Sequence, residues 1–208
     1  MIQNEIINNG YCLVRLNSNI GLVDAVSEIQ NSFNSILKRD VVINSSPTEG
    51  ELGANTEDFW CHTDGVFINT PPSYVLIQVI EADAGGELCL LDTAHISHVF
   101  SKEEFFFGKD ENGVKSKIVS YDENSQKTIF RYREDYMASL QPNSTLFNEN
   151  RKITDYVAKA ELKIGKLMPG EFLIIDNWRM LHRRRSFTGK RTIRRLWFFQ
   201  SHSKKNSL

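Results

Sequence analysis

The strongest fold signal in the chain is FLIIDNWRMLHRRRSFTGKRTIRRLWFFQ, residues 172–200. It follows Pro169-Gly170, a pair typical of turns, and begins with an apolar run that predicts a buried strand. The chain then turns polar before RTIRRLWFFQ at 191–200, which predicts a further strand. Short strands separated by polar turns favour a β-rich fold.

Earlier segments repeat this pattern of short apolar runs. SYVLIQVIEA (73–82) and GELCLLDT (86–93) predict adjacent buried strands with a turn between them. KSKIVSYD (115–122) and KTIFRYRE (127–134) predict a hairpin closed by the polar residues between them. YCLVRL, near the amino terminus, predicts one more extended segment.

Two segments have helical periodicity and one has none. Residues 21–38 place apolar side chains at intervals of three and four, as an amphipathic helix requires, and a second helix is expected over 147–160. Residues 41–57 are rich in Ser, Asn, Gly and acids, and we expect them to form a lid loop. The fold class predicted from the whole pattern is mainly β with helices, a sandwich or barrel.

Bulk composition indicates a soluble globular protein. The chain has 208 residues, is 40% hydrophobic and carries a formal net charge of −1, so no global charge favours nucleic acid or membrane. We expect one domain over residues 1–208 and a cytoplasmic location, with no membrane association. Three cysteines without CxxC spacing predict neither a disulfide framework nor a thiolate zinc site.

The candidate metal ligands begin with His62-Thr63-Asp64. Residues two apart on a strand point to the same face, so His62 and Asp64 would enter one cavity together. An HxD pair alone also fits a polar pair on an ordinary strand. His182 follows a buried strand and could present its side chain at a cavity mouth, which would complete a site of two histidines and one carboxylate.

Two arginines follow His182 on the last predicted strand. Arg191 and Arg195 are four residues apart and therefore share a face, whereas Arg194 points the other way. A guanidinium group matches a carboxylate with two parallel hydrogen bonds and stays charged when partly desolvated. The pair therefore predicts a site for a dicarboxylate.

These residues resemble the taurine dioxygenase and clavaminate synthase-like Fe(II)/2-oxoglutarate-dependent oxygenases. The resemblance is carried by HTDGVF, by PPSYVLIQ followed by GGELCLLD, and by PGEFLIIDNWRMLHRRRSFTGKRTIRRLWFF, which together span about residues 59–199. It implies a double-stranded β-helix core, jelly-roll and cupin-like. It also implies an oxygenase that uses Fe(II), 2-oxoglutarate and O2, and releases succinate and CO2.

The resemblance assigns roles by position. His62, Asp64 and His182 look like the iron ligands, Arg195 looks like the arginine that holds the distal carboxylate of 2-oxoglutarate, and Arg191 resembles an arginine nearer the iron. One position departs from the pattern, because Leu88 stands where relatives supply a threonine hydroxyl to 2-oxoglutarate. That change would weaken co-substrate binding unless another hydroxyl serves in its place. The segment 177–179 resembles a support for the ligand strand.

The expected reaction is hydroxylation or desaturation of an unactivated C–H bond. The substrate would be a small molecule, amino-acid-derived or bound to a carrier protein, and the candidate contacts are Phe67, Asn69 and Arg184. The sequence does not predict the oligomeric state.

Three other functions fit parts of the sequence. Residues 179–195 hold seven Arg and one Lys, a density that a nucleic-acid or polyanion binding module would use, although no recognition motif accompanies it. Leu88 and the short chain fit a non-catalytic β-helix binding protein. A zinc hydrolase could use the same three ligands, but no general base stands beside them.

Overall fold

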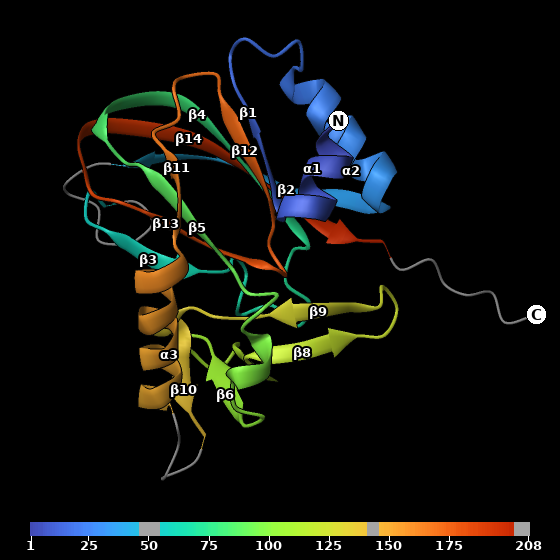
Figure 1. The fold of residues 1–208 in the computed structure, drawn as a ribbon, viewed down its shortest axis with the longest axis vertical. Coiled ribbons are helices and arrows are strands. Elements are labelled where there is room, and N and C mark those ends of the chain that lie inside the picture. Colours follow the sequence, from blue (N-terminus) through green and yellow to red (C-terminus); the bar gives the residue numbers. More distant parts are fainter. Residues whose placement is uncertain (46–54, 141–145, 202–208) are drawn as a thin grey trace, which may run out of the picture.

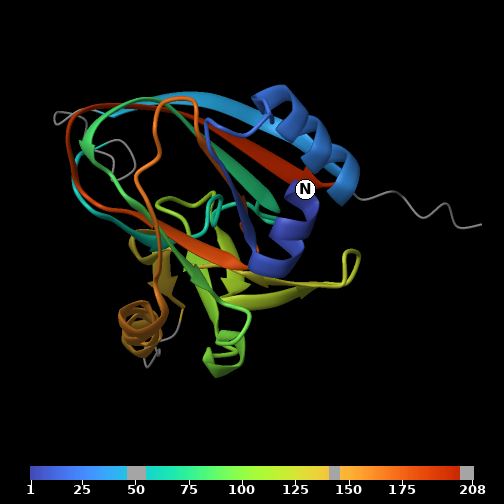
Figure 2. The same ribbon diagram turned by 45° about the horizontal axis from the view of Figure 1, so that its top comes forward.

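Two antiparallel sheets face each other in the computed structural model, which describes residues 1–45, 55–140 and 146–201 (Figures 1 and 2). The first sheet has the strand order β1 (Tyr11–Val14), β12 (Phe172–Asp176), β4 (Tyr74–Gly85), β14 (Phe187–Gln200), β2 (Ser35–Ser45). The second has the order β11 (Leu162–Gly165), β5 (Leu88–Asp92), β13 (Met180–Arg184), β3 (Phe59–His62). The predicted mainly β, jelly-roll fold is confirmed.

Alternation along the strands explains why the first sheet is buried on both faces. On β12, Leu173 and Ile175 pack between the sheets against side chains of β5 and β13, whereas Phe172 and Ile174 point to the opposite face. That outer face is covered by α1 (Ile2–Asn9) and α2 (Leu22–Phe33), which lie along it in Figure 1. A strand that is buried on both sides reads as a continuous apolar run, as FLII does.

A smaller unit packs beneath the second sheet. It contains a three-stranded sheet, a hairpin, one α-helix and two short 3-10 helices: β10 (Met137–Ser139), β6 (Glu104–Phe107), β7 (Val114–Lys117), β8 (Val119–Asp122), β9 (Lys127–Phe130), α3 (Leu146–Ala160), η1 (Ser97–Val99), η2 (Glu134–Tyr136). An aromatic core joins this unit to the second sheet. The unit contributes Phe105, Phe107 and Phe130 to the core, and the sheet contributes Leu91 and Leu181. The predicted helix at 147–160 is present, and the predicted hairpin is present in shorter form, because residues 115–117 belong to β7 and β9 ends at Phe130.

The predictions differ from the structure mainly in which strands pair and in where elements begin and end. The segments at 73–82 and 86–93 do form strands, but they belong to different sheets, so the chain crosses between layers at Gly85 and Gly86. FLIID and MLHRR are likewise strands of different sheets. Apolar alternation identifies a strand but not its neighbour. The helix α1 was not predicted.

The predicted lid loop begins too early. Residues 41–45 belong to β2, where Val41 and Ile43 pair with β14, because β-branched side chains favour a strand. Residues 46–54 of the proposed lid lie outside the described residues. Among the described residues, no helix has the length and apolar character needed to cross a membrane.

The predicted helix over 21–38 ends at Phe33 because of one residue. Asn34 adopts a left-handed conformation with φ 46°, and its backbone N–H donates to the Gln30 carbonyl. β2 begins at the next residue. Asn tolerates this conformation better than other residues that carry a β-carbon.

We expect Asn34→Val to lower the free energy of unfolding by about 1–2 kcal/mol, because a β-branched residue is strained at positive φ. Asn34→Gly removes the same side-chain hydrogen bond to the Ser201 carbonyl but relieves the strain, and should stay within about 0.5 kcal/mol of the native protein. Urea unfolding of both variants measures the difference. Equal destabilisation by the two changes would show that the side-chain contact, not the backbone, controls this position.

Candidate metal centre

The three predicted ligands meet at one point between the strands. His62 ends β3, Asp64 follows it, and His182 lies on β13 directly opposite His62 in the antiparallel register. His62 Nε2 lies 3.5 Å and His182 Nε2 lies 3.8 Å from Asp64 Oδ1. All three side chains are buried, and their ligand atoms lie within 4.8 Å of one another.

The hydrogen bonding of His62 determines which nitrogen can bind a metal. His62 Nδ1 lies 2.8 Å from the Trp60 carbonyl oxygen, which can only accept, so Nδ1 carries the proton and Nε2 has the lone pair. Nε2 of His62 and Nε2 of His182 are buried and have no hydrogen-bond partner among the described residues. Burial lowers the pKa of both imidazoles below the ordinary value. Neutral rings with unpaired lone pairs are the form that metal ions bind.

Asp64 is held in its charged form. Burial opposes ionisation, but the Arg195 guanidinium outweighs it and lowers the pKa of Asp64. Trp197 Nε1 donates to Oδ2 at 3.0 Å, and Arg195 Nη1 donates to Oδ1 at 3.3 Å. The carboxylate therefore has one oxygen fixed by the indole, and the other faces the two histidines.

The backbone of Asp64 is fixed by Asn177, in the turn between β12 and β13. The Asn177 side chain accepts from Asp64 N at 2.8 Å and donates to the carbonyls of Asp64 and Pro72. The adjacent Trp178 donates from its indole to the Pro71 carbonyl at 3.0 Å. The segment predicted to support the ligand strand thus contacts the loop that carries Asp64.

Arg131 shapes the same loop and was not predicted. Its buried guanidinium donates to the carbonyls of Val66, Ile68 and Asn69, and burial lowers its pKa to about 10. Arg131 lies just beyond β9, where no periodicity marks its direction, so sequence patterns gave no sign of this contact.

The two predicted anion-binding arginines reach one cavity. Arg191 and Arg195 line it together with Leu88, Arg184 and His182. Burial and repulsion between neighbouring guanidinium groups lower the pKa of Arg191 to about 9. No carboxylate side chain is among the residues that line this cavity. Arg191 forms no ion pair with a described residue, and its positive charge makes the cavity a site for an anion.

The side chains around this cavity match the predicted directions. Arg184, a predicted substrate contact, lies two residues from His182 on β13, lines the same cavity and donates to the carbonyls of Asn55 and Arg185. Arg194 points away and pairs with Asp40. Leu88 is buried in the cavity and brings no hydroxyl group there.

A second, wider cavity of about 370 Å3 opens beside Asp64. Of the predicted substrate contacts, Phe67 lines this cavity, whereas Asn69 is exposed and is not among the lining residues. Arg39, Arg133 and Tyr136 also line it. They lie on three separate segments, so sequence spacing could not bring them together.

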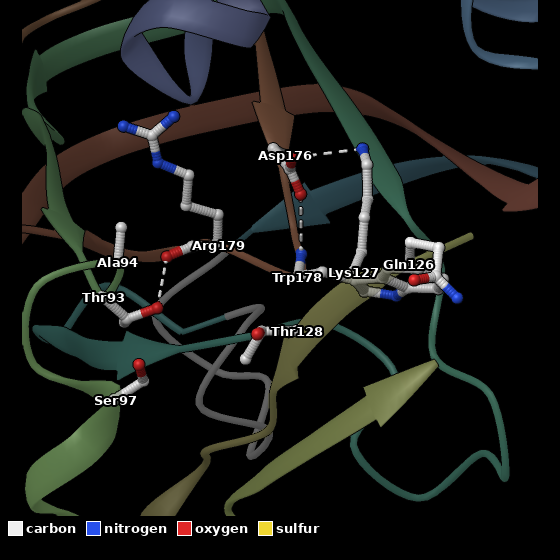
Figure 3. A pocket seen from close by; sticks show the side chains of 9 residues that line it. All are labelled: Thr93, Ala94, Ser97, Gln126, Lys127, Thr128, Asp176, Trp178 and Arg179. Atoms are coloured by element: carbon white, nitrogen blue, oxygen red, sulfur yellow. Dashed lines mark hydrogen bonds and ion pairs between the residues drawn. The ribbon is translucent and has the colours of Figure 1, made fainter. Parts of the chain in front are cut away.

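A third cavity, of about 350 Å3, lies at the outer side of the turn between β12 and β13 (Figure 3). Asp176 forms part of its wall, accepting from the Trp178 backbone at 3.1 Å and lying 3.8 Å from Lys127 Nζ. His62, Asp64 and His182 are not among the residues that line it. These contacts hold the turn that carries Asn177, and the cavity itself is separate from the metal centre.

The fold and the site together define a class of protein: a jelly roll in which neighbouring strands bring two histidines and one carboxylate together. The family model described as taurine catabolism dioxygenase TauD, TfdA family, matches residues 109–197. The trimethyllysine dioxygenase of Meyerozyma guilliermondii is 27% identical over 160 residues, 64% of this chain and 40% of that protein. Over these residues the chain is similar to the TauD-like Fe(II)/2-oxoglutarate-dependent oxygenases, and it spans about 40% of the length of this curated relative.

Solved structures support the fold independently. An asparagine oxygenase, solved with Fe(II), 3-hydroxyasparagine and succinate, matches with a TM-score of 0.59 at 18% identity, covering 76% of this chain and 56% of that one. The oxygenase OrfP, solved with Fe and alpha-ketoglutaric acid, matches with a TM-score of 0.59 at 15% identity, covering 77% and 56%. The matched part therefore spans little more than half of these proteins.

We expect Asn177→Leu to lower metal affinity by about 10- to 100-fold, because the Asp64 backbone loses the amide that fixes it. The free energy of unfolding should also fall by about 2–3 kcal/mol, since buried backbone groups are left unpaired. Titration with Co(II) and urea unfolding measure the two effects. Asn112→Leu, at an exposed turn, is the matched control. An unchanged metal affinity would contradict the proposed support.

The histidines make the metal-free protein sensitive to acid. Their pKa values are lowered in the folded state, so below pH 6.5 the unfolded chain binds more protons than the folded one and stability falls as the pH falls. We expect the Tm to decrease between pH 7.5 and 5.5, and His182→Gln to make this decrease shallower. Calorimetry across the range tests it. Parallel curves for the two proteins would contradict the prediction.

Proposed function

We propose that the chain is a non-haem Fe(II)/2-oxoglutarate-dependent oxygenase. The observation that carries this proposal is the convergence of two unpaired imidazole nitrogens and one ionised carboxylate beside a cavity lined by arginines. Two nitrogens and one oxygen suit Fe(II), and three protein ligands leave coordination positions for other molecules. The residues present therefore fit the metal.

The iron, with 2-oxoglutarate and O2, would supply the oxidant for a C–H bond and release succinate and CO2. The protein's own residues perform the binding and positioning. Arg195 and Arg191 would hold carboxylates, because Arg191 is buried, Arg195 is partly buried and both line the cavity next to His182. Asp64 stays ionised through its contacts with Arg195 and Trp197.

The distribution of arginine argues against a polyanion-binding module. Arg179 pairs with Asp92, Arg183 with Asp58 and Glu161, and Arg194 with Asp40. Arginines that are already paired with acids have less charge to offer a phosphate backbone. Arg191 and Arg39, which form no ion pair with a described residue, line cavities, where their charge is less accessible to a nucleic acid than a surface patch would be.

The proposed substrate is a small, amino-acid-like molecule, and the reaction is hydroxylation or desaturation. The relatives support this choice through their names, which describe oxygenases of trimethyllysine and asparagine. Delivery by a carrier protein remains one form of the same proposal. The wide cavity beside Asp64 has a volume in the range of small-molecule sites.

Anaerobic addition of Fe(II) and 2-oxoglutarate should produce a weak visible absorption band near ~500 nm, expected when a keto acid chelates ferrous iron at open positions. His182→Ala should abolish the band, and Arg195→Ala should raise the 2-oxoglutarate concentration needed for half its intensity by about tenfold or more. Arg194→Gln, a variant of the neighbouring residue that points away, should leave it unchanged. A folded protein without the band at millimolar 2-oxoglutarate would favour a non-catalytic binding protein in which Leu88 marks a lost co-substrate site.

A further inference from the structure

The wide cavity beside Asp64 has aromatic walls. Four aromatic side chains line it: Phe59, Phe67, Tyr136 and Trp197. Aromatic walls of this kind bind a cationic ligand when the ring faces are open to it, since the face of a ring is electronegative. The arrangement of the rings alone would therefore suit a quaternary ammonium group.

Here the protein's own cations lie over these ring faces. The Arg133 guanidinium lies 4.1 Å from the centre of the Tyr136 ring and 5.1 Å from that of Phe59. Arg39 lies 4.4 Å from the centre of the Trp197 ring. Lys109 adds a third cation, 4.7 Å from the centre of Tyr136. A cationic ligand would meet fixed positive charge where it needs an open ring face.

The charge of the lining favours an anion. Three arginines line the cavity, and Asp64 is the one acidic residue among its described lining residues. Asp64 already contacts Arg195 and forms part of the metal centre. The Arg39 guanidinium stacks on Trp197 and forms no ion pair with a described residue, so no acid offsets its charge. Arg133 pairs with Asp135, which lies outside the lining, so Arg39 supplies the excess of positive charge at the cavity.

Arg133 is the arginine best placed to bind a ligand. Asp135 accepts from Nε at 2.9 Å and from Nη2 at 3.1 Å, which holds the guanidinium in one orientation. Nη1 donates to no described residue and is not buried. The charge of Arg133 also reaches the metal centre, where it helps to lower the pKa of His62 and His182. A fixed guanidinium with a free N–H group is prepared for a carboxylate oxygen.

We propose that Arg133, assisted by Arg39, selects a substrate with a carboxylate at this end of the cavity and rejects one with a quaternary ammonium group there. This inference rests on the proposed function, because it treats the cavity beside Asp64 as the substrate site. By this proposal, the substrate of this chain differs from that of the trimethyllysine dioxygenases it resembles in the charge of the group at this end of the cavity. The apolar part of the substrate then lies against Phe67 and Ile43.

The test uses three probes that share a five-carbon chain: hexanoate, hexanamide and pentyltrimethylammonium. Binding to the folded full chain is measured by saturation-transfer NMR at constant ionic strength, with millimolar 2-oxoglutarate present to occupy the arginine cavity next to His182. This measurement needs no turnover. We expect hexanoate to bind at least about tenfold more tightly than either other probe, since a hydrogen bond to a charged group has about this effect.

Three variants test which arginine causes the preference for hexanoate. Arg133→Gln should remove most of the difference between hexanoate and hexanamide, and Arg39→Gln should reduce it. Arg194→Gln, which removes a paired arginine from the outer side of β14, should leave it unchanged. If Arg133→Gln does not fold, judged by its Tm, Arg39→Gln alone decides, and an unchanged preference in that variant overturns the proposal.

The proposal is also overturned if hexanamide or the ammonium probe binds as tightly as hexanoate, or if hexanoate does not bind. These outcomes are distinct from failure of the proposed function, which the ferrous absorption band reports separately. A protein that shows the band but no preference for the acid is an oxygenase with another substrate class. A protein that prefers the acid through Arg133 but shows no band is a binding protein with the inferred selectivity.

Discussion

The pairing of β13 with β3 sets His182 opposite His62, and the rest of the site depends on that register. Side chains alternate along a strand, so a slip of one residue would exchange His182 with its neighbours. Leu181 would then leave the aromatic core, and Arg183 would lose Asp58 and Glu161. The apolar and ionic contacts on one face of β13 therefore fix the position of the ligand on the other face. β5 reinforces this register from the opposite edge.

The site contains several buried polar atoms that a stability-optimised core would not keep. Three imidazole nitrogens and Arg195 Nε have no hydrogen-bond partner among the described residues, and unpaired buried groups cost about 1–3 kcal/mol each. Asn177 and Arg131 compensate by satisfying the backbone of the loop that carries Asp64. Local rules of folding are typically broken at functional sites and supported elsewhere in this way. Unpaired nitrogens beside a well-supported Asp64 loop indicate a site that is built for binding and not for stability.

The sequence predicted the parts of the molecule that periodicity and spacing encode. Strand alternation placed His62 with Asp64, and the four-residue interval placed Arg191 with Arg195. The sequence did not predict which sheet each strand joins, because apolar runs buried on both faces look alike. The sequence also contained no sign of the roles of Arg133 and Arg39, because the residues around an arginine that stacks on an aromatic ring look the same as those around a solvent-exposed arginine. The end of α2 was missed because it depends on one backbone conformation, that of Asn34.

Arg195 links the two cavities on either side of Asp64, because it lines both. Its guanidinium contacts Asp64 Oδ1, the same oxygen that faces both histidines. A cation bound among the three ligand atoms would compete with Arg195 for that oxygen. An anion in the arginine cavity would offer Arg195 another partner, so the two events favour each other electrostatically. This arrangement explains why a basic lining can lie next to a metal centre. Without ligands, the Asp64 carboxylate offsets the charge of Arg195; with both ligands bound, Asp64 would bind the metal and Arg195 would bind the anion.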